Sequence, residues 1–222
     1  MNKTKIEWCD FTWNPVVGCT GGCAYCYARK MAHRFHWDFT PHWVERNFQR
    51  AMPRKPSRIF VNSMSDVADW EPEWHGCVLA CIHQHPEHLF LFLSKRPWQV
   101  PRYYDWPNIM LGYSATDQDD VQRLVNRVEN VSFISFEPLH GQVRLWGKPP
   151  RWIIVGAETG NRSGRIVPKR VWLESIYEYA RGNSTPLFFK DSLLAIWGQD
   201  NFPREYPATG GMCLKCKGER DA

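Results

Sequence analysis

Runs of apolar residues alternate with more polar, helix-forming segments along most of the chain. Short continuous apolar runs are typical of β-strands that are buried on both faces of a parallel sheet. Six such runs predict strands at residues 58–63, 88–93, 108–113, 131–136, 152–156 and 186–190. The stretch 13–17 predicts a further strand near the N-terminus.

The segments between these runs predict helices. Residues 27–36 have no helix breakers, and Thr40-Pro41 provides an N-cap and a first-turn proline for a helix to about residue 51. Helical spacing of apolar residues predicts further helices at 71–85, 117–130 and 168–181.

Strands that alternate with helices favour parallel βαβ units. The connections 97–107 and 138–151 look too short or too rich in proline to form full helices, so a regular eight-fold barrel is not expected. An α/β fold with an incomplete (β/α)6 barrel over residues 1–200, followed by a short cysteine-containing tail at 201–222, fits the count. Periodicity leaves a doubly wound open sheet as an alternative.

A glycine-rich stretch directly after the first predicted strand contains three closely spaced cysteines, Cys19, Cys23 and Cys26. Three thiolates at the spacing C-x3-C-x2-C suit an iron–sulfur cluster better than the paired ligands of a zinc knuckle. No fourth cysteine is near, so a [4Fe–4S] cluster here would keep one iron without a protein ligand. A small zinc site or three incidental buried thiols are the alternatives.

Polar side chains follow the ends of the predicted strands. They are Ser63, Asp66, Lys95, Arg96, Ser114, Glu137, Glu158 and Lys190. The carboxyl ends of parallel strands share one edge, so we expect these residues and the cysteine loop to meet at one mouth. Alternating charge there suits a zwitterionic ligand, and the turn after Gly156 lets backbone approach it. Alternatively, these charges only pair with one another.

The cysteine stretch resembles the signature of the radical S-adenosylmethionine (SAM) enzymes, C-x3-C-x-aromatic-C, in which Tyr25 fills the aromatic position. This resemblance implies that the open iron binds the amino and carboxylate groups of SAM. It also implies reductive cleavage of SAM to a 5′-deoxyadenosyl radical, which abstracts hydrogen from a substrate. A reductant such as flavodoxin or ferredoxin would supply the electron.

The resemblance extends over residues 3–195. It rests on the segments 4–8, 12–15, 59–66, 94–97, 136–139 and 154–160. These are similar, in order and spacing, to an uncharacterised radical-SAM-like family of phages and bacteria, and more distantly to the spore photoproduct lyases, which act on DNA. The cysteine loop of that family is often longer, so the loop of this chain is a compact version. A nucleic acid, such as phage DNA with a modified base, is the expected substrate class.

If SAM is the ligand, as the resemblance implies, each strand-end residue can be assigned a role. Carboxylates would take the positive groups of SAM and basic side chains its carboxylate. We expect cofactor binding by Tyr25, Ser63, Asp66, Lys95, Arg96, Ser114, Gly156 and Glu158. We expect substrate contact or catalysis by Glu137, Tyr113 and Lys190.

Composition adds a second functional hypothesis. The 222 residues have a net charge of +5 and include twelve tryptophans, which is compatible with a polyanionic partner and with base stacking. A metal-stabilised nucleic-acid-binding protein without catalysis is therefore the alternative. No signal-peptide core and no apolar run of membrane-spanning length is present, so we expect a cytoplasmic protein.

The remaining cysteines carry weaker signals. The pair Cys213 and Cys216 has the spacing of half a zinc or iron–sulfur knuckle. The two interpretations are a second metal site at these cysteines and a tail that binds no metal. Cys77 and Cys81 share a helix face with apolar residues, which predicts a buried core pair. Cys9 is expected to pack beside Trp8.

Overall fold

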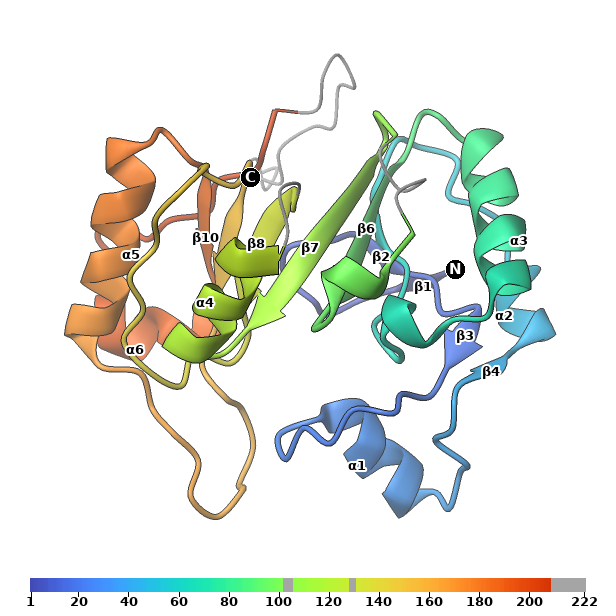
Figure 1. Ribbon diagram of the computed structural model, residues 1–222, viewed down its shortest axis with the longest axis horizontal. Helices are drawn as coiled ribbons and strands as arrows, with labels where there is room; N and C mark the ends of the chain where they lie inside the picture. The colour runs from blue at the N-terminus through green and yellow to red at the C-terminus, as the bar shows by residue number, and fades with distance from the viewer. Residues whose placement is uncertain (102–105, 128–130, 209–222) are drawn as a thin grey trace, which may run out of the picture. The chain divides into compact units, whose positions relative to one another are not determined.

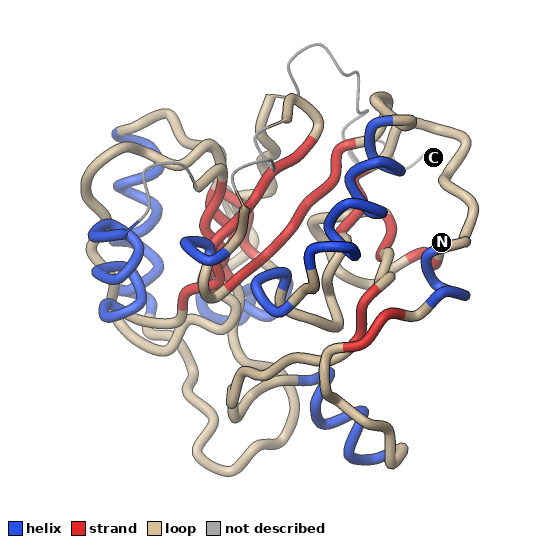
Figure 2. The backbone as a smooth tube through the Cα atoms, turned by 45° about the vertical axis from the view of Figure 1, so that its right-hand side comes forward, coloured by secondary structure: helices blue, strands red, loops and turns tan. Residues whose placement is uncertain are grey.

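The computed structural model describes residues 1–101, 106–127 and 131–208, and the chain forms two compact units (Figure 1). The first unit contains Met1–Phe92 together with 106–110 and 208, and the second contains Leu93–Pro101 and Leu111–Pro207. Helices and parallel strands occur in both units, which confirms the α/β class (Figure 2). No helix in the described ranges combines the length and apolar character needed to cross a membrane.

The first unit contains a sheet with the strand order β1-β2-β5-β6 and a separate antiparallel pair, β3 and β4. β2 is parallel to β5, and β5 to β6, whereas β1 is antiparallel to β2. Its elements are β1 (Asn2–Lys3), β2 (Phe11–Thr12), β3 (Val16–Val17), α1 (Tyr27–Arg34), β4 (His42–Trp43), α2 (Glu45–Phe48), β5 (Arg58–Phe60), η1 (Val67–Asp69) and α3 (Pro72–His83), and β6 (Leu89–Ser94) begins within it.

In the second unit the strands β7, β8, β9 and β10 are adjacent and mutually parallel. Its elements are η2 (Pro97–Gln99), β7 (Ile109–Ala115, whose first two residues group with the first unit), α4 (Gln118–Arg127), β8 (Phe133–Phe136), β9 (Ile153–Val155), α5 (Arg170–Gly182), β10 (Leu187–Phe189), η4 (Asp191–Leu193) and α6 (Leu194–Trp197). α5 lies beside this sheet, and its buried residues Leu173, Ile176 and Ala180 join the apolar core of the unit.

Large rings fill much of the interior of both units. Trp8 and Trp13 are almost fully buried in the first unit, and Trp152 is in the second. Cys9 is also fully buried, which confirms its expected place in the core. Other rings, among them Trp37 and Trp146, are exposed.

The helix expected over 41–51 is wrong. His42–Trp43 pair with β3 as an antiparallel strand, and only Glu45–Phe48 are helical. Asp38 accepts hydrogen bonds from the amide (2.9 Å) and the hydroxyl (2.7 Å) of Thr40. The Thr40 hydroxyl is turned toward Asp38, and the residues after it extend as a strand instead of beginning a helix.

The expected strand at 13–17 also differs. The residues that enter the parallel sheet are Phe11–Thr12, and Val16–Val17 belong to the separate two-stranded sheet. The cysteine loop therefore follows β3 rather than a strand of the main sheet. A one-dimensional apolar pattern does not tell which sheet a short strand joins, because both sheets bury apolar side chains.

The buried cysteine pair on α3 is likewise wrong. His75, Val78 and Ile82 are buried, whereas Cys77 is exposed and Cys81 is half-buried. Cys77 and Cys81 directly precede the buried residues Val78 and Ile82. Successive residues of an α-helix are rotated by about 100°, so the two cysteines point to the side of the buried face.

Candidate metal centre

The cysteine loop is held at its start by the backbone of the strand-end segment after β5. Gly18 forms a parallel bridge with Ser65, and its amide donates to the Met64 carbonyl at 3.0 Å. Gly18 has a φ of +102°, and a Cβ atom there would lie 2.1 Å from the carbonyl oxygen of Thr40. Only glycine fits this position, so it fixes where Cys19 begins the loop.

The three thiols are free and half-buried. The Cys19 sulfur accepts the Gly21 amide at 3.2 Å, and the Cys26 sulfur accepts the Arg29 amide at 3.4 Å as the N-cap of α1. Such N–H···S contacts stabilise negative charge on sulfur, whether on a thiolate or in a cluster.

The spacing of the thiols separates two kinds of metal site. Sulfurs bound tetrahedrally at about 2.3 Å to a single zinc ion stand about 3.8 Å apart. Among the described residues, the sulfurs of Cys19, Cys23 and Cys26 do not all lie within 4.8 Å of one another. In a cubane cluster each thiolate binds a different iron, so its thiolates stand further apart than around one ion. The three sulfurs are therefore not arranged around a single tetrahedral ion.

Acidic side chains surround the start of the loop. Asp69 accepts hydrogen bonds from the amide (3.0 Å) and the hydroxyl (2.7 Å) of Thr20, and Asp66 accepts from the Ala68 amide at 3.0 Å. Burial, with a smaller contribution from Asp66 and Asp69, raises the pKa of the Cys19 thiol to about 12. The metal-free thiol is therefore protonated at neutral pH.

Two residues of α1 tie the loop to its surroundings. Arg29 donates from its guanidinium to the carbonyls of Cys19 (2.8 Å) and Gly21, and the Tyr27 hydroxyl donates to the Ser63 carbonyl at 2.5 Å. The Ser63 hydroxyl in turn donates to Asn14 Oδ1 at 3.1 Å. These contacts bring the cysteine loop and the strand end after β5 together, as the sequence predicted for Ser63 and Asp66. Tyr25 is half-buried within the same loop.

A second polar group lies at the strand ends of the second unit. Lys190 Nζ lies 2.6 Å from Glu137 Oε2, and the Ser135 hydroxyl donates to Glu137 Oε1 at 2.8 Å. A Cβ atom on Gly156 would lie 2.9 Å from Lys190 Cδ, so this glycine makes room for the pair. Lys95 Nζ donates to the Ser114 carbonyl at 3.2 Å.

Tyr113 and Arg96 have other surroundings. Tyr113 is 1 % exposed within the apolar core, and its hydroxyl lies 3.4 Å from Asp120 Oδ1. Burial, together with the Asp120 charge, raises its pKa well above the usual range. The Arg96 amide donates to the Ser94 hydroxyl at 2.9 Å.

Glu158 is almost fully buried and already paired. Arg162 donates two hydrogen bonds to its carboxylate, at 2.6 and 2.8 Å, and His140 Nε2 lies 3.3 Å from Oε2. The Arg162 guanidinium lowers the pKa of Glu158 to about 2. A ligand ammonium at Glu158 would have to share the carboxylate with Arg162.

The sequence-predicted residues therefore fall into two sets. Cys19, Cys23, Cys26, Tyr25, Ser63 and Asp66 belong to the first unit, and Tyr113, Ser114, Lys95, Arg96, Glu137, Gly156, Glu158 and Lys190 belong to the second. Their convergence on one mouth stays a prediction. Cys213 and Cys216, the candidates for a second metal, lie outside the described residues.

Sequence reasoning missed Asp69, Arg29, Arg162 and His140. The spacing of four between Glu158 and Arg162 was the one local signal, since such a spacing often marks an ion pair. Asp69 contacts Thr20, and His140 contacts Glu158. These residues are far apart in the chain, so no local sequence pattern predicts the contacts.

Comparison with known proteins gives a family and one relative. Residues 3–218 match a family described as "Protein of unknown function (DUF5131)". A stretch of 71 residues, 30 % of the chain, is 31 % identical to an uncharacterized protein, MJ0683, of Methanocaldococcus jannaschii, and covers 27 % of that protein. No solved structure matches the chain.

Proposed function

The chain belongs to the DUF5131 family, and we propose that it is a radical SAM enzyme with a [4Fe–4S] cluster on Cys19, Cys23 and Cys26. The observation that carries this proposal is the anchored loop, which brings three free, half-buried thiols with the spacing C-x3-C-x2-C together at the start of α1. When bound, the cluster would supply the electron for reductive cleavage of SAM to a 5′-deoxyadenosyl radical.

The loop's own contacts support this role. Arg29 holds the carbonyls of Cys19 and Gly21, so the segment between the first two thiols is constrained before any metal binds. Backbone N–H groups donate hydrogen bonds to the sulfurs of Cys19 and Cys26, and such hydrogen bonds to sulfur are a feature of iron–sulfur sites. Loading of the cluster must remove a proton from Cys19, whose pKa is about 12 in the metal-free protein.

The polar strand ends of the second unit supply both signs of charge that a zwitterion needs. We assign the Glu137–Lys190 pair and Lys95 to contacts with SAM or the substrate, because they are only partly buried and already hydrogen-bonded in place. The proposal includes the incomplete (β/α)6 barrel of this enzyme class, a cytoplasmic location and a flavodoxin- or ferredoxin-like reductant. The parallel strands within each unit support the barrel.

A nucleic acid is the proposed substrate class. α1 and the turn after it expose Tyr27, Met31, Phe35 and Trp37, which are 51 %, 39 %, 51 % and 53 % accessible, and we call these residues the α1 surface. The Arg34 guanidinium lies 5.6 Å from the centre of the Phe35 ring. Exposed rings beside cations are the usual platform for unpaired bases. The same surface supports the alternative, a metal-stabilised nucleic-acid-binding protein without catalysis.

Metal content separates these two functions. After anaerobic reconstitution we expect about four irons per chain and a cubane absorption, and after reduction with dithionite an EPR signal. With SAM and dithionite, the protein should release 5′-deoxyadenosine. Alanine at Cys19, Cys23 or Cys26 should remove the cluster and this activity.

The matched control is Cys77→Ala, because Cys77 is an exposed thiol on α3, outside the loop. It should keep full iron content and activity. Iron content that is unchanged in the three loop variants would refute the cluster assignment. Zinc without iron in the wild-type protein would favour the non-catalytic alternative.

The substrate can be found by isotope transfer. Incubation with candidate deuterated nucleic acids should place deuterium in 5′-deoxyadenosine when the abstracted hydrogen comes from the labelled carbon. Deuterium from a labelled protein or small metabolite, with none from nucleic acid, would contradict the substrate class but leave the enzyme class intact.

A further inference from the structure

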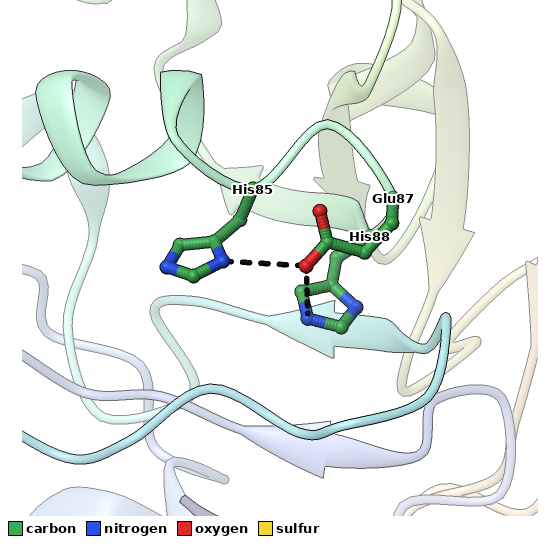
Figure 3. A group of neighbouring side chains, drawn as sticks. All are labelled: His85, Glu87 and His88. Carbon is green, nitrogen blue, oxygen red and sulfur yellow. Dashed lines mark hydrogen bonds and ion pairs between the residues drawn. The ribbon is translucent and has the colours of Figure 1, made fainter.

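Two histidines and a glutamate meet at the turn between α3 and β6, away from the cysteine loop. His85 Nδ1 lies 3.3 Å from Glu87 Oε1, and His88 Nε2 lies 3.4 Å from the same oxygen (Figure 3). The three ligand atoms all lie within 4.8 Å of one another. All three residues belong to the first unit.

The backbone holds this turn in a defined shape. The His88 amide donates to the His85 carbonyl at 3.2 Å, and the His85 amide donates to the Ile82 carbonyl at 3.0 Å. Asn108 Nδ2 also donates to the His85 carbonyl, at 3.4 Å. The fold therefore places the three side chains next to one another.

His88 carries the strongest evidence for a ligand. Its side chain is 0 % exposed, and its ring nitrogens have weak contacts only: Nε2 lies 3.4 Å from Glu87 Oε1, and the Pro53 backbone is the other polar neighbour of the ring. A buried polar group without a partner costs roughly 1–3 kcal/mol, so such groups generally have an unseen partner. A buried imidazole is neutral by preference, since burying a charge is costly, and the neutral ring is the form that binds metals.

We propose that His85 Nδ1, Glu87 Oε1 and His88 Nε2 bind one divalent transition-metal ion of the zinc type. Ligand atoms about 2.0–2.1 Å from a tetrahedral ion stand about 3.3–3.4 Å apart. The two separations from Glu87 Oε1, 3.3 and 3.4 Å, match this value and are long for N–H···O hydrogen bonds. The two ring nitrogens lie within 4.8 Å of each other, so binding of an ion would draw them together. Two imidazoles with one carboxylate select zinc-like ions over Mg²⁺ or Ca²⁺, which prefer oxygen ligands.

The second ring nitrogen of His88 also fits this assignment. When Nε2 binds a metal, Nδ1 carries the ring proton, and metal-bound histidines usually donate that proton to a carboxylate or a backbone carbonyl. The Pro53 backbone lies beside the His88 ring. Because His85 and Glu87 are partly exposed, with 32 % and 43 % of their side chains accessible, the fourth position of the ion is open to water.

The position of the site in the sheet indicates its role. His88 directly precedes β6, whereas Ser63 and Asp66 follow β5, and the two strands are parallel. The ion would therefore lie at the opposite edge of this sheet from the strand end that contacts the cysteine loop. There it would join the end of α3 to the start of β6, and thereby stabilise the first unit independently of the cluster.

Zinc titration of the full-length protein tests the proposal. His85→Ala and Glu87→Gln should each lose about one zinc equivalent per chain, or bind it more than about tenfold more weakly. Both residues are partly exposed, so these variants should fold without zinc, whereas His88→Ala would open a cavity. The matched controls are His42→Ala and Glu73→Gln, which change exposed residues of the same unit, and both should keep the wild-type stoichiometry.

Cobalt distinguishes this site from the cysteines. Co²⁺ at the proposed site should give visible bands without thiolate-to-cobalt charge transfer, and these bands should be absent in His85→Ala. Zinc at about a hundred times its dissociation constant should raise the wild-type melting temperature by about 5–10 °C, but not that of the two ligand variants. Equal zinc stoichiometry in all variants, or equally tight binding of Mg²⁺, would overturn the proposal.

Discussion

Gly18 is the residue on which the geometry of the cysteine loop depends most. Any side chain would combine a left-handed backbone, which costs of order 1–3 kcal/mol, with a collision against the Thr40 carbonyl. We expect Gly18→Ala to destabilise the protein by at least about 2 kcal/mol and to lower its iron content after reconstitution. Thermal unfolding and iron analysis measure the two effects.

Gly22 provides the control in the same loop. A Cβ atom there would meet no other atom within 4 Å, so Gly22→Ala should behave like the wild-type protein. If both variants lose stability and iron to the same extent, the loop is sensitive to any loss of glycine and the argument from Gly18 fails.

Glu158 gives the stability a defined pH dependence. Its pKa is about 2 in the folded protein, below the ordinary value of 4.5, because Arg162 binds the charged form. The pairing therefore stabilises the fold above about pH 5 and is lost as the pH falls toward 2. Urea unfolding should show wild type more stable than Glu158→Gln at pH 6, with a smaller difference at pH 3. A difference that is constant over this range would contradict this account.

At the scale of single elements, the α1 surface tests the nucleic-acid hypothesis. Phe35 and Trp37 stack on each other with ring centres 5.2 Å apart and remain half-exposed. Loss of a base-stacking ring typically costs about 1–3 kcal/mol. Phe35→Ala and Trp37→Ala should each weaken binding of single-stranded DNA by that amount in a fluorescence titration, and the binding should weaken with salt.

Trp146 is the control for these variants, because it is an exposed tryptophan of the second unit. Trp146→Ala should leave the affinity for DNA unchanged. An equal loss in all three variants, or no salt dependence, would remove the support that the α1 surface lends to this substrate class.

Elements with one strong local signal were predictable. The strand β6 and the helix α1 follow the expected ranges to within two residues, because a buried apolar run and an unbroken helix-forming segment each have one dominant reading. The segment after Thr40 was compatible with two structures, a capped helix and a strand, and it pairs with β3 while Thr40 contacts Asp38. Such competition between a cap and a turn depends on side-chain rotamers, which a linear pattern does not contain.

At the scale of the molecule, the rule that ligand sites lie at strand ends selected polar residues but not the contacts between them. It found Ser63, Glu137 and Lys190, yet the ion pair of Glu137 with Lys190 joins positions 53 residues apart. Long-range contacts of this kind follow from strand register, which the sequence does not state. The division into two units was also unpredictable, since it falls within the apolar strands β6 and β7.

That division has a consequence for how the chain is made. The first unit takes up residues 106–110 only after the chain has passed through 93–101, and the Asn108 carbonyl accepts the Phe90 amide at 2.8 Å. During synthesis, the first unit therefore cannot be completed until residues 106–110 have also left the ribosome. Gene fragments that stop before residue 106 would encode an open-ended sheet, so the two units are better studied by point substitution than by dissection.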